Sequence, residues 1–333
     1  MHSSTTTNSP SPECFLVTGA LGCIGAWTVH RLARENVQVV AFDVGSDRRR
    51  LRLLMDKAAL SRVRFVEGDV ANAQSLEHAL DSHGVTHVIH LAALLHPRFK
   101  ADPPLGAHVN VMGSVNVFEA VARRRERIAR IVYASSIAVY DKSDVADGAT
   151  VTHQTVGRPS TLYGVFKQAE EAMARVYFSD RGVSSIGLRP AAVFGAGRDD
   201  GLSAAPTQAI MAAARGGPFH IPYGGRSHLH YADDLAAIFI AAARSRFEGA
   251  DAFSIRGTTA DMSEIVAAIE EAEPRARGTI SFDGPELPLP TDYDGVALEA
   301  VIGALPRTSL ADATRETLAI FRRSIAAAGA HRG

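Results

Sequence analysis

The sequence predicts an α/β fold in which helices cover both faces of a parallel sheet. Three observations support this prediction. Short β-prone runs alternate with longer helical patterns through the first half of the chain. The first of these runs, CFLVT at 14–18, is apolar, as expected of a strand buried on both faces. The 333 residues, of which 46% are hydrophobic, suffice for one large α/β domain or two smaller ones.

The elements follow one another as strand and helix up to Pro190. Strands are predicted over residues 14–18, 37–43, 63–69, 85–93, 130–136 and 184–190. Helices are predicted from Cys23 to Glu35, roughly over 105–125, and through the segment that contains Tyr163. After Pro190, loops rich in glycine and proline separate helical runs at 233–246, 261–273 and 309–328. We therefore expect a larger domain over 13–190 and a smaller lobe over 191–333, with a boundary that segments from either part can cross.

Bulk properties exclude several classes of partner. The formal net charge of −1 gives no electrostatic reason to expect nucleic acid or an anionic membrane surface. No apolar run reaches transmembrane length, and residues 1–12 are expected to be a disordered tail rather than a signal peptide. The two cysteines, Cys14 and Cys23, cannot form a disulfide framework, which favours a reducing, cytoplasmic setting. No metal site is predicted.

A glycine-rich loop, VTGALGCIG, joins the first predicted strand to the first predicted helix. Gly19 permits the tight turn, Gly22 lets the backbone approach a pyrophosphate, and Gly25 lets the helix lie close to the sheet. The helix N-terminus would face the phosphates with unpaired N–H groups and a partial positive charge. The alternative is a tight strand-to-helix turn that binds nothing.

Two acidic residues at strand ends support a dinucleotide. Asp43 ends the second predicted strand, where it can accept hydrogen bonds from ribose hydroxyls and would repel a 2′-phosphate, which favours NAD over NADP. The arginines at 48–50 weaken that preference slightly, although we interpret them as a solvated helix start. Asp69 ends the third predicted strand, where it would contact adenine or, equally well, cap the following helix.

The segment TLYGVFKQ places Tyr163 four residues before Lys167, so both side chains share one helix face. A phenol has an ordinary pKa of about 10 and is protonated at neutral pH, but a nearby ammonium favours the phenolate. Tyr163 would then act as a general acid or base on a hydroxyl proton. The alternative is an ordinary pair on a helix surface.

With further marks in order, the sequence resembles the extended short-chain dehydrogenases/reductases, which include the sugar-nucleotide epimerases. The marks are TGALGCIG, Asp43, GDV, HLAA (90–93), NVMGSVNV (110–117), YASSIAVY (133–140), Tyr163 with Lys167, LRPAAVFGAG (188–197) and YADDLA (231–236). The resemblance implies a Rossmann-type, doubly wound parallel sheet of about seven strands with a smaller C-terminal α+β substrate lobe. It also implies bound NAD, hydride transfer at a carbon bearing a hydroxyl or ketone, and a homodimer joined through helices near 105–125 and 160–180.

The resemblance assigns Ser136, Tyr163 and Lys167 as the catalytic residues. Ser136, directly before IAVY and chosen over Ser135, would bond the substrate oxygen, and Lys167 would also hold the nicotinamide ribose. His90 is interpreted as a packed strand histidine. Asn110 would bond backbone or water near the site, or simply serve a loop-to-helix turn. The predicted cofactor contacts are Gly19, Gly22, Cys23, Ile24, Gly25, Asp43, Asp69, Val70, Leu91, Ala92, Ala93, Asn110, Tyr163, Lys167, Pro190 and Val193.

Departures from the family pattern bear on the substrate. Ile137 and Ala138 stand where family dehydratases carry an Asp-Glu pair, which argues against dehydration. Ala192 and Ser227 replace an asparagine and an arginine that are usual in nucleotide-sugar members, so a smaller sugar, sugar acid, polyol or hydroxy acid fits better. The predicted substrate contacts are His96, Ser136, Arg189, Arg198, Arg226 and His228, with Arg98, Lys100 and His230 as further candidates.

Three functions remain open on this basis. The favoured one is an NAD-dependent dehydrogenase of a small hydroxylated substrate, which predicts stoichiometric release of NADH. A sugar or nucleotide-sugar 4-epimerase would instead retain NAD and release no net NADH. A dinucleotide-binding regulator without catalysis is the third, and the presence of Ser136, Tyr163 and Lys167 together argues against it.

Overall fold

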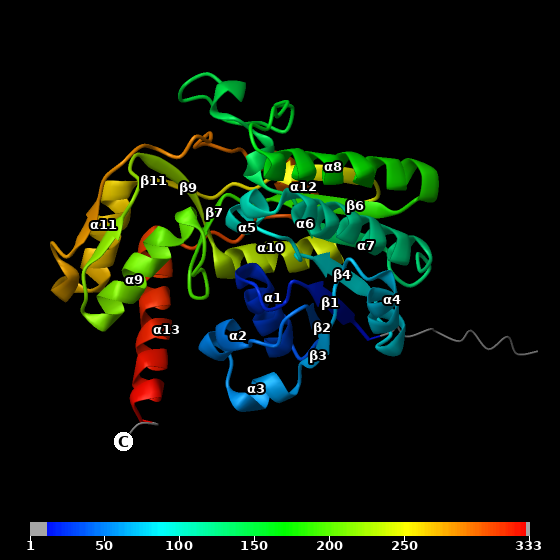
Figure 1. The fold of residues 1–333 in the computed structure, drawn as a ribbon, viewed down its shortest axis with the longest axis horizontal. Coiled ribbons are helices and arrows are strands. Elements are labelled where there is room, and N and C mark those ends of the chain that lie inside the picture. Colours follow the sequence, from blue (N-terminus) through cyan, green and yellow to red (C-terminus); the bar gives the residue numbers. More distant parts are fainter. Residues whose placement is uncertain (1–11, 331–333) are drawn as a thin grey trace, which may run out of the picture.

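The structure of the chain, a computed structural model, describes residues 12–330 (Figure 1). The predicted tail over residues 1–12 lies outside the described residues apart from Pro12. A parallel seven-stranded sheet has the order β10-β6-β5-β4-β1-β2-β3, which confirms the predicted doubly wound α/β fold. Its strands are β1 (Cys14–Thr18), β2 (Gln38–Asp43), β3 (Arg64–Glu67), β4 (His87–His90), β5 (Arg130–Ala134), β6 (Ser184–Arg189) and β10 (Ala250–Ser254).

Alternate side chains of the central strand β1 enter two separate cores. Phe15 and Val17 pack on one side of the sheet and Leu16 on the other, and all three are fully buried. The first side is covered by α1 (Cys23–Arg34) and α10 (Ala232–Arg244). The second is covered by α4 (Ala73–Ser82), α7 (Gly113–Ala122) and α8 (Leu162–Arg181). A strand that is buried on both faces is mostly apolar, and this explains the run CFLV over residues 14–17.

The helical segment before β5 differs from the single helix predicted over roughly 105–125. It consists of α6 (Pro103–Ala107), a π-helical turn η1 (His108–Met112) and α7. Asn110, in the middle of η1, is buried and bonds the backbone of Leu94 with both ends of its side-chain amide. Wide turns of this kind occur often at functional sites. Here the turn directs a side-chain amide onto the loop that follows β4.

The second half of the chain forms a smaller lobe beside the sheet (Figure 1). Its strands are β7 (Ala192–Phe194), β9 (Arg226–Tyr231) and β11 (Thr258–Asp261) in one sheet, and β8 (Phe219–Ile221) and β12 (Ile280–Phe282) in another. The helices α9 (Ala205–Arg215), α11 (Met262–Ala272) and α13 (Leu310–Ala330) pack against one another. Two elements of this half nevertheless belong to the main sheet domain, because β10 pairs with β6 and α10 packs on α1.

Short helices complete the described chain. The α-helical ones are α2 (Arg49–Leu54), α3 (Lys57–Ser61), α5 (His96–Ala101) and α12 (Val296–Ile302), and the 3-10 turns are η2 (Ile137–Val139), η3 (Lys142–Asp144), η4 (Leu202–Ala204) and η5 (Pro274–Ala276). An isolated bridge between Val151 and Tyr293 ties the long loop before α8 to the smaller lobe. A small core containing Ile137, Tyr140 and Tyr293 fills the junction beneath this bridge.

Candidate active site

The glycine loop lies at the carboxyl edge of the sheet, between β1 and α1. Gly19 has φ +66°, and a Cβ there would lie 2.7 Å from the backbone nitrogen of Ala92. A Cβ on Gly25 would lie 2.2 Å from the carbonyl oxygen of Gly19. Gly22 is the N-cap of α1 and provides no side-chain cap, so the helix begins with N–H groups open to a ligand. The loop has the tightness and the polarity that a diphosphate requires.

Asp43 at the end of β2 stands beside this loop. Its carboxylate accepts hydrogen bonds from Leu21 N at 2.9 Å and from Gly45 N at 3.3 Å. It also lines a cavity of about 170 Å³ whose wall includes Arg48 and Phe65. The Arg48 guanidinium lies 3.6 Å from the centre of the Phe65 ring. The cavity adjoins the glycine loop, as an adenosine site would.

The other two arginines of the 48–50 run lie at the predicted helix start, where Arg49 is exposed and Arg50 is half-buried. Both Arg49 and Arg50 pair with Asp199, at 3.1 and 2.5 Å, and so join α2 to the loop after β7.

Asp69 does not cap α4, because Asn72 is the N-cap of that helix. The Asp69 carboxylate instead accepts a bond from Ala71 N at 2.9 Å. Its adenine contact stays a prediction.

The start of α8, which contains Tyr163, packs on the turn η2, which Ser136 caps. Ser136 is the N-cap of η2, and its Oγ accepts a bond from Ala138 N at 3.1 Å. Tyr163 lies in the first turn of α8, and a Cβ on the next residue, Gly164, would lie 2.0 Å from the carbonyl oxygen of Ala138. Only a glycine lets α8 start this close to the Ser136 turn.

The neighbouring serine has a different partner. Ser135 is buried, and its Oγ donates to Glu171 at 2.5 Å. Arg189 donates to the same carboxylate from Nε at 2.8 Å and from Nη2 at 2.7 Å. Its Nη1 donates to the hydroxyl of Tyr140 at 2.7 Å. These contacts hold the strand ends of β5 and β6 in place and engage Ser135 inside the protein.

Lys167 is buried beneath Tyr163 and bonds within the protein. Its Nζ donates to the carbonyl oxygen of Ala134 at 2.6 Å and to Glu170 Oε2 at 2.9 Å. Burial lowers the pKa of Lys167, but the charges of Glu170 and Tyr163 raise it by more, so the net direction is upward. Lys167 is therefore an ammonium. Two of its three protons are engaged, and one is left for a ligand.

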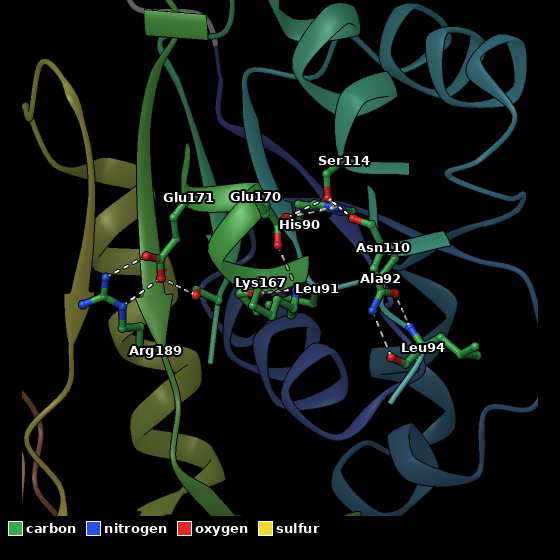
Figure 2. Close-up of polar contacts among 12 residues, drawn as sticks. His90, Leu91, Ala92, Leu94, Asn110, Ser114, Lys167, Glu170, Glu171 and Arg189 are labelled. Atoms are coloured by element: carbon green, nitrogen blue, oxygen red, sulfur yellow. Dashed lines mark hydrogen bonds and ion pairs between the residues drawn. The ribbon is translucent and has the colours of Figure 1, made fainter. Parts of the chain in front are cut away.

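A row of polar side chains runs from Glu170 through Ser114 to His90 (Figure 2). Ser114 Oγ donates to Glu170 Oε1 at 2.7 Å and lies 3.2 Å from His90 Nε2. His90 Nδ1 lies 2.7 Å from Thr18 Oγ1 at the end of β1. Thr18 Oγ1 accepts bonds from Leu91 N and Ala92 N, at 3.2 and 3.3 Å. The strand β4 ends at His90, rather than at residue 93 as predicted.

The predicted substrate contacts are dispersed. His228 is buried, and its Nε2 accepts a bond from Gly257 N at 2.9 Å. Arg226 is exposed and lies 3.8 Å from Asp292. Arg198 donates to Ser203 from Nη2, while its buried Nε has no partner among the described residues. His96 begins α5, but its side chain lies outside the described part of the chain, as does that of Arg98. Arg189, Arg198 and His228 thus have partners within the protein.

Two kinds of feature are not found among residues 12–330. No group of three or more histidine, cysteine, aspartate or glutamate residues there could hold a metal ion. No helix in the same range has the length and apolar content needed to cross a membrane.

The two cysteines are unpaired, and burial raises the pKa of the Cys23 thiol to about 12, so it is not a thiolate at neutral pH.

A family model described as the NAD dependent epimerase/dehydratase family matches residues 15–255. The chain belongs to this family, whose members depend on NAD. It is 34% identical to UDP-glucuronate 4-epimerase 3 of Arabidopsis thaliana over 190 residues, which cover 56% of this chain and 44% of that protein. The match thus spans less than half of that relative's length.

Two solved structures are similar to most of the chain. One is titled a partial consensus L-threonine 3-dehydrogenase, with a TM-score of 0.81 and 23% identity, covering 93% of this chain and 99% of that one. This likeness shows the fold alone. The other is the UDP-glucose 4-epimerase of Thermus thermophilus in complex with NAD, with a TM-score of 0.77 and 25% identity, covering 92% and 98% of the two chains.

Proposed function

We propose that the chain is an NAD-dependent oxidoreductase acting on the secondary alcohol or ketone carbon of a small hydroxylated substrate: a sugar, sugar acid, polyol or hydroxy acid. One observation carries the proposal. A buried lysine ammonium lies one helical turn from Tyr163, and Gly164, the residue after Tyr163, packs on the Ala138 carbonyl in the turn that Ser136 caps. This group stands at the carboxyl edge of the sheet, on the same side as the glycine loop, where doubly wound folds bind their ligands.

The residues present fit NAD. Gly19, Gly22 and the open N–H groups of α1 would hold the diphosphate. Asp43, in its cavity, would accept bonds from the adenosine ribose. The remaining proton of Lys167 would bond the nicotinamide ribose. When bound, the nicotinamide supplies the acceptor or donor of hydride.

The chain's own residues would transfer the proton of the substrate hydroxyl. In the oxidation direction Tyr163 takes the proton of the substrate hydroxyl as the carbon loses its hydride, and in reduction it returns that proton. The Lys167 ammonium stabilises the Tyr163 phenolate, which is present before oxidation and after reduction. Ser136 donates its hydroxyl to the substrate oxygen and keeps it in reach of Tyr163. No second acid–base pair follows Ser136, since Ile137 and Ala138 occupy those positions.

A 4-epimerase is the second candidate, because epimerases are among the proteins to which the chain is similar. It would use the same three residues and differ in retaining NAD. Two measurements separate the candidates: assay of NAD(H) released from the denatured purified protein, and NADH absorbance with a panel of free sugars, sugar acids, polyols and nucleotide sugars. We expect the purified protein to release no NAD(H) on denaturation and to form NADH with one compound of the panel. Retained NAD without net NADH from any compound would instead establish the epimerase.

We also propose that the chain forms a homodimer. Leu105 on α6 and Met112 on η1 are exposed, as are Leu162, Val165 and Val176 along α8. Figure 1 shows α8 lying beside α6 and α7, so these side chains belong to neighbouring helices on one side of the sheet. Exposed apolar side chains on adjacent helices are typical of a subunit interface. Light scattering should give twice the mass of the chain, and Val165→Glu should halve it; a monomeric wild-type protein would contradict the proposal.

A further inference from the structure

Glu170 lies between the candidate catalytic lysine and the interior of the protein. Its side chain is 1% exposed and that of Lys167 is 5% exposed. One carboxylate oxygen accepts from Lys167 Nζ at 2.9 Å, and the other accepts from Ser114 Oγ at 2.7 Å. A carboxylate in such surroundings is costly unless it is paired and hydrogen-bonded, and both oxygens of Glu170 are.

The proton positions in this row follow from the number of donors and acceptors (Figure 2). Thr18 Oγ1 accepts two backbone N–H bonds, so its own proton goes to His90 Nδ1. His90 then carries its proton on Nε2 and donates it to Ser114 Oγ. The single proton of Ser114 goes to Glu170 rather than to Asn110 O at 2.8 Å, because a carboxylate is the stronger acceptor.

This assignment requires a neutral His90 and a charged Glu170. Burial, followed by the charge of Lys167, lowers the pKa of His90 to about 3, which agrees with a neutral ring. Every donor in the row is then used once, from Thr18 to Glu170. The Glu170 carboxylate therefore accepts a hydrogen bond from Ser114 on one side and from the Lys167 ammonium on the other.

The other titratable groups around Lys167 add no net charge. On α8, Glu171 is balanced by Arg189 from β6 through two hydrogen bonds. On β5, burial raises the pKa of Tyr133 well above its ordinary value, so this phenol is neutral. On β4, His90 is neutral, and α6, η1 and α7 bring Ser114 but no charged side chain toward the pair. On α5, Lys100 is exposed, and the contact with Tyr163 comes from the Phe99 ring.

We propose that Glu170 is a positioning residue: it is the buried counter-ion that fixes Lys167 Nζ and sets the pH at which the Tyr163–Lys167 pair releases its proton. The proposal rests on the proposed function for its catalytic meaning. With Glu170 charged, the protonated pair and its counter-ion are neutral together, and loss of a proton leaves a net negative charge. With a neutral residue in its place, the protonated pair is a buried, unbalanced cation and releases its proton more easily.

Glu170→Gln tests this proposal, because glutamine keeps the shape, accepts from Lys167 and donates to Ser114. Phenolate absorbance is titrated against pH in the wild type and in Glu170→Gln, each minus its Tyr163→Phe counterpart. The difference isolates the phenol of Tyr163 and requires neither NAD nor substrate. We expect its midpoint to fall by about one pH unit in Glu170→Gln. Ser114→Ala, which keeps the carboxylate, is the matched control and should leave the midpoint near that of the wild type.

An unchanged or higher midpoint in Glu170→Gln would overturn the proposal. Should this variant not fold, Glu170→Met removes the same charge with an apolar side chain of similar length and carries the same expectation. The rising limb of kcat/KM against pH, in the oxidation direction, should move with the absorbance midpoint. A shifted absorbance midpoint in a protein that oxidises no substrate would support the role of Glu170 and count against the proposed function alone.

Discussion

Glu171→Gln should destabilise the protein strongly, because it removes the partner of a buried guanidinium. Arg189 donates to Glu171 through Nε and Nη2 at 2.8 and 2.7 Å, and the two side chains are 12% and 5% exposed. Glutamine retains one acceptor oxygen but no charge. Removal of one member of a buried ion pair costs about 3–5 kcal/mol, and here a third contact, from Ser135, is weakened as well. Urea unfolding of both proteins measures the difference in the free energy of unfolding.

A double-mutant cycle separates the pair from its surroundings. Arg189→Met should also destabilise the protein, since it leaves the Glu171 carboxylate unbalanced. The double variant Glu171→Gln with Arg189→Met removes both charges, and we expect it to lose less stability than the two single changes added together, by about 2–3 kcal/mol. Additive losses, or a Glu171→Gln variant within about 1 kcal/mol of the wild type, would refute the view that this pair is a coupled buried unit.

Three other predictions follow from the site and its surroundings. NADP should bind at least about tenfold more weakly than NAD, because the Asp43 carboxylate repels the 2′-phosphate. Asp43→Asn should reduce this difference in affinity, as titration of both nucleotides would show. Gly164→Ala should cost about 1–3 kcal/mol of stability in urea unfolding and reduce turnover, because its Cβ would meet the carbonyl of the Ser136 turn; an unaffected variant would contradict that packing. Burial lowers the pKa of both His90 and His230 to about 3, so the unfolded chain binds more protons than the folded one between about pH 6.5 and 3. The free energy of unfolding should therefore fall as pH decreases through this window, by up to about 1.4 kcal/mol per pH unit for each histidine, and His230→Gln should make the fall shallower.

The fold and the tight glycine turn were predictable because their signals are local. An apolar strand such as CFLVT, the spacing of Gly19, Gly22 and Gly25, and an acid at the end of the second strand are all readable within one short segment. The spacing of Tyr163 and Lys167 is equally local, since one helical turn defines it. Because β1 and β2 run parallel, the glycine loop that follows β1 and Asp43 at the end of β2 lie at the same edge of the sheet.

The buried polar row was not predicted, because its members come from separate elements. Ser114 lies 56 residues before Glu170, and His90 lies 24 residues before Ser114. One local signal existed: Glu170 follows Lys167 by three residues on a helix, so the two side chains share a face. Nothing in the sequence showed that this helix face is buried where it carries Lys167 and Glu170.

The predicted substrate contacts illustrate a second limit. Arginine and histidine are suited to bind a hydroxylated or acidic ligand, but residue type does not show which partner a side chain takes in the fold. Arg189 bonds Glu171 and Tyr140, and His228 accepts from Gly257 N, so both use internal partners. Their roles toward a substrate stay predictions, as do those of Arg198 and Arg226.

Comparison of Tyr163→Phe with the wild type tests the central claim most directly. Calorimetry gives the affinity for NAD, and NADH absorbance gives turnover with the substrate found in the panel. We expect NAD affinity to change little, since the phenylalanine ring keeps the contact with Phe99, and turnover to fall at least about 100-fold. Turnover close to that of the wild type would show that another group exchanges the proton and would contradict the account.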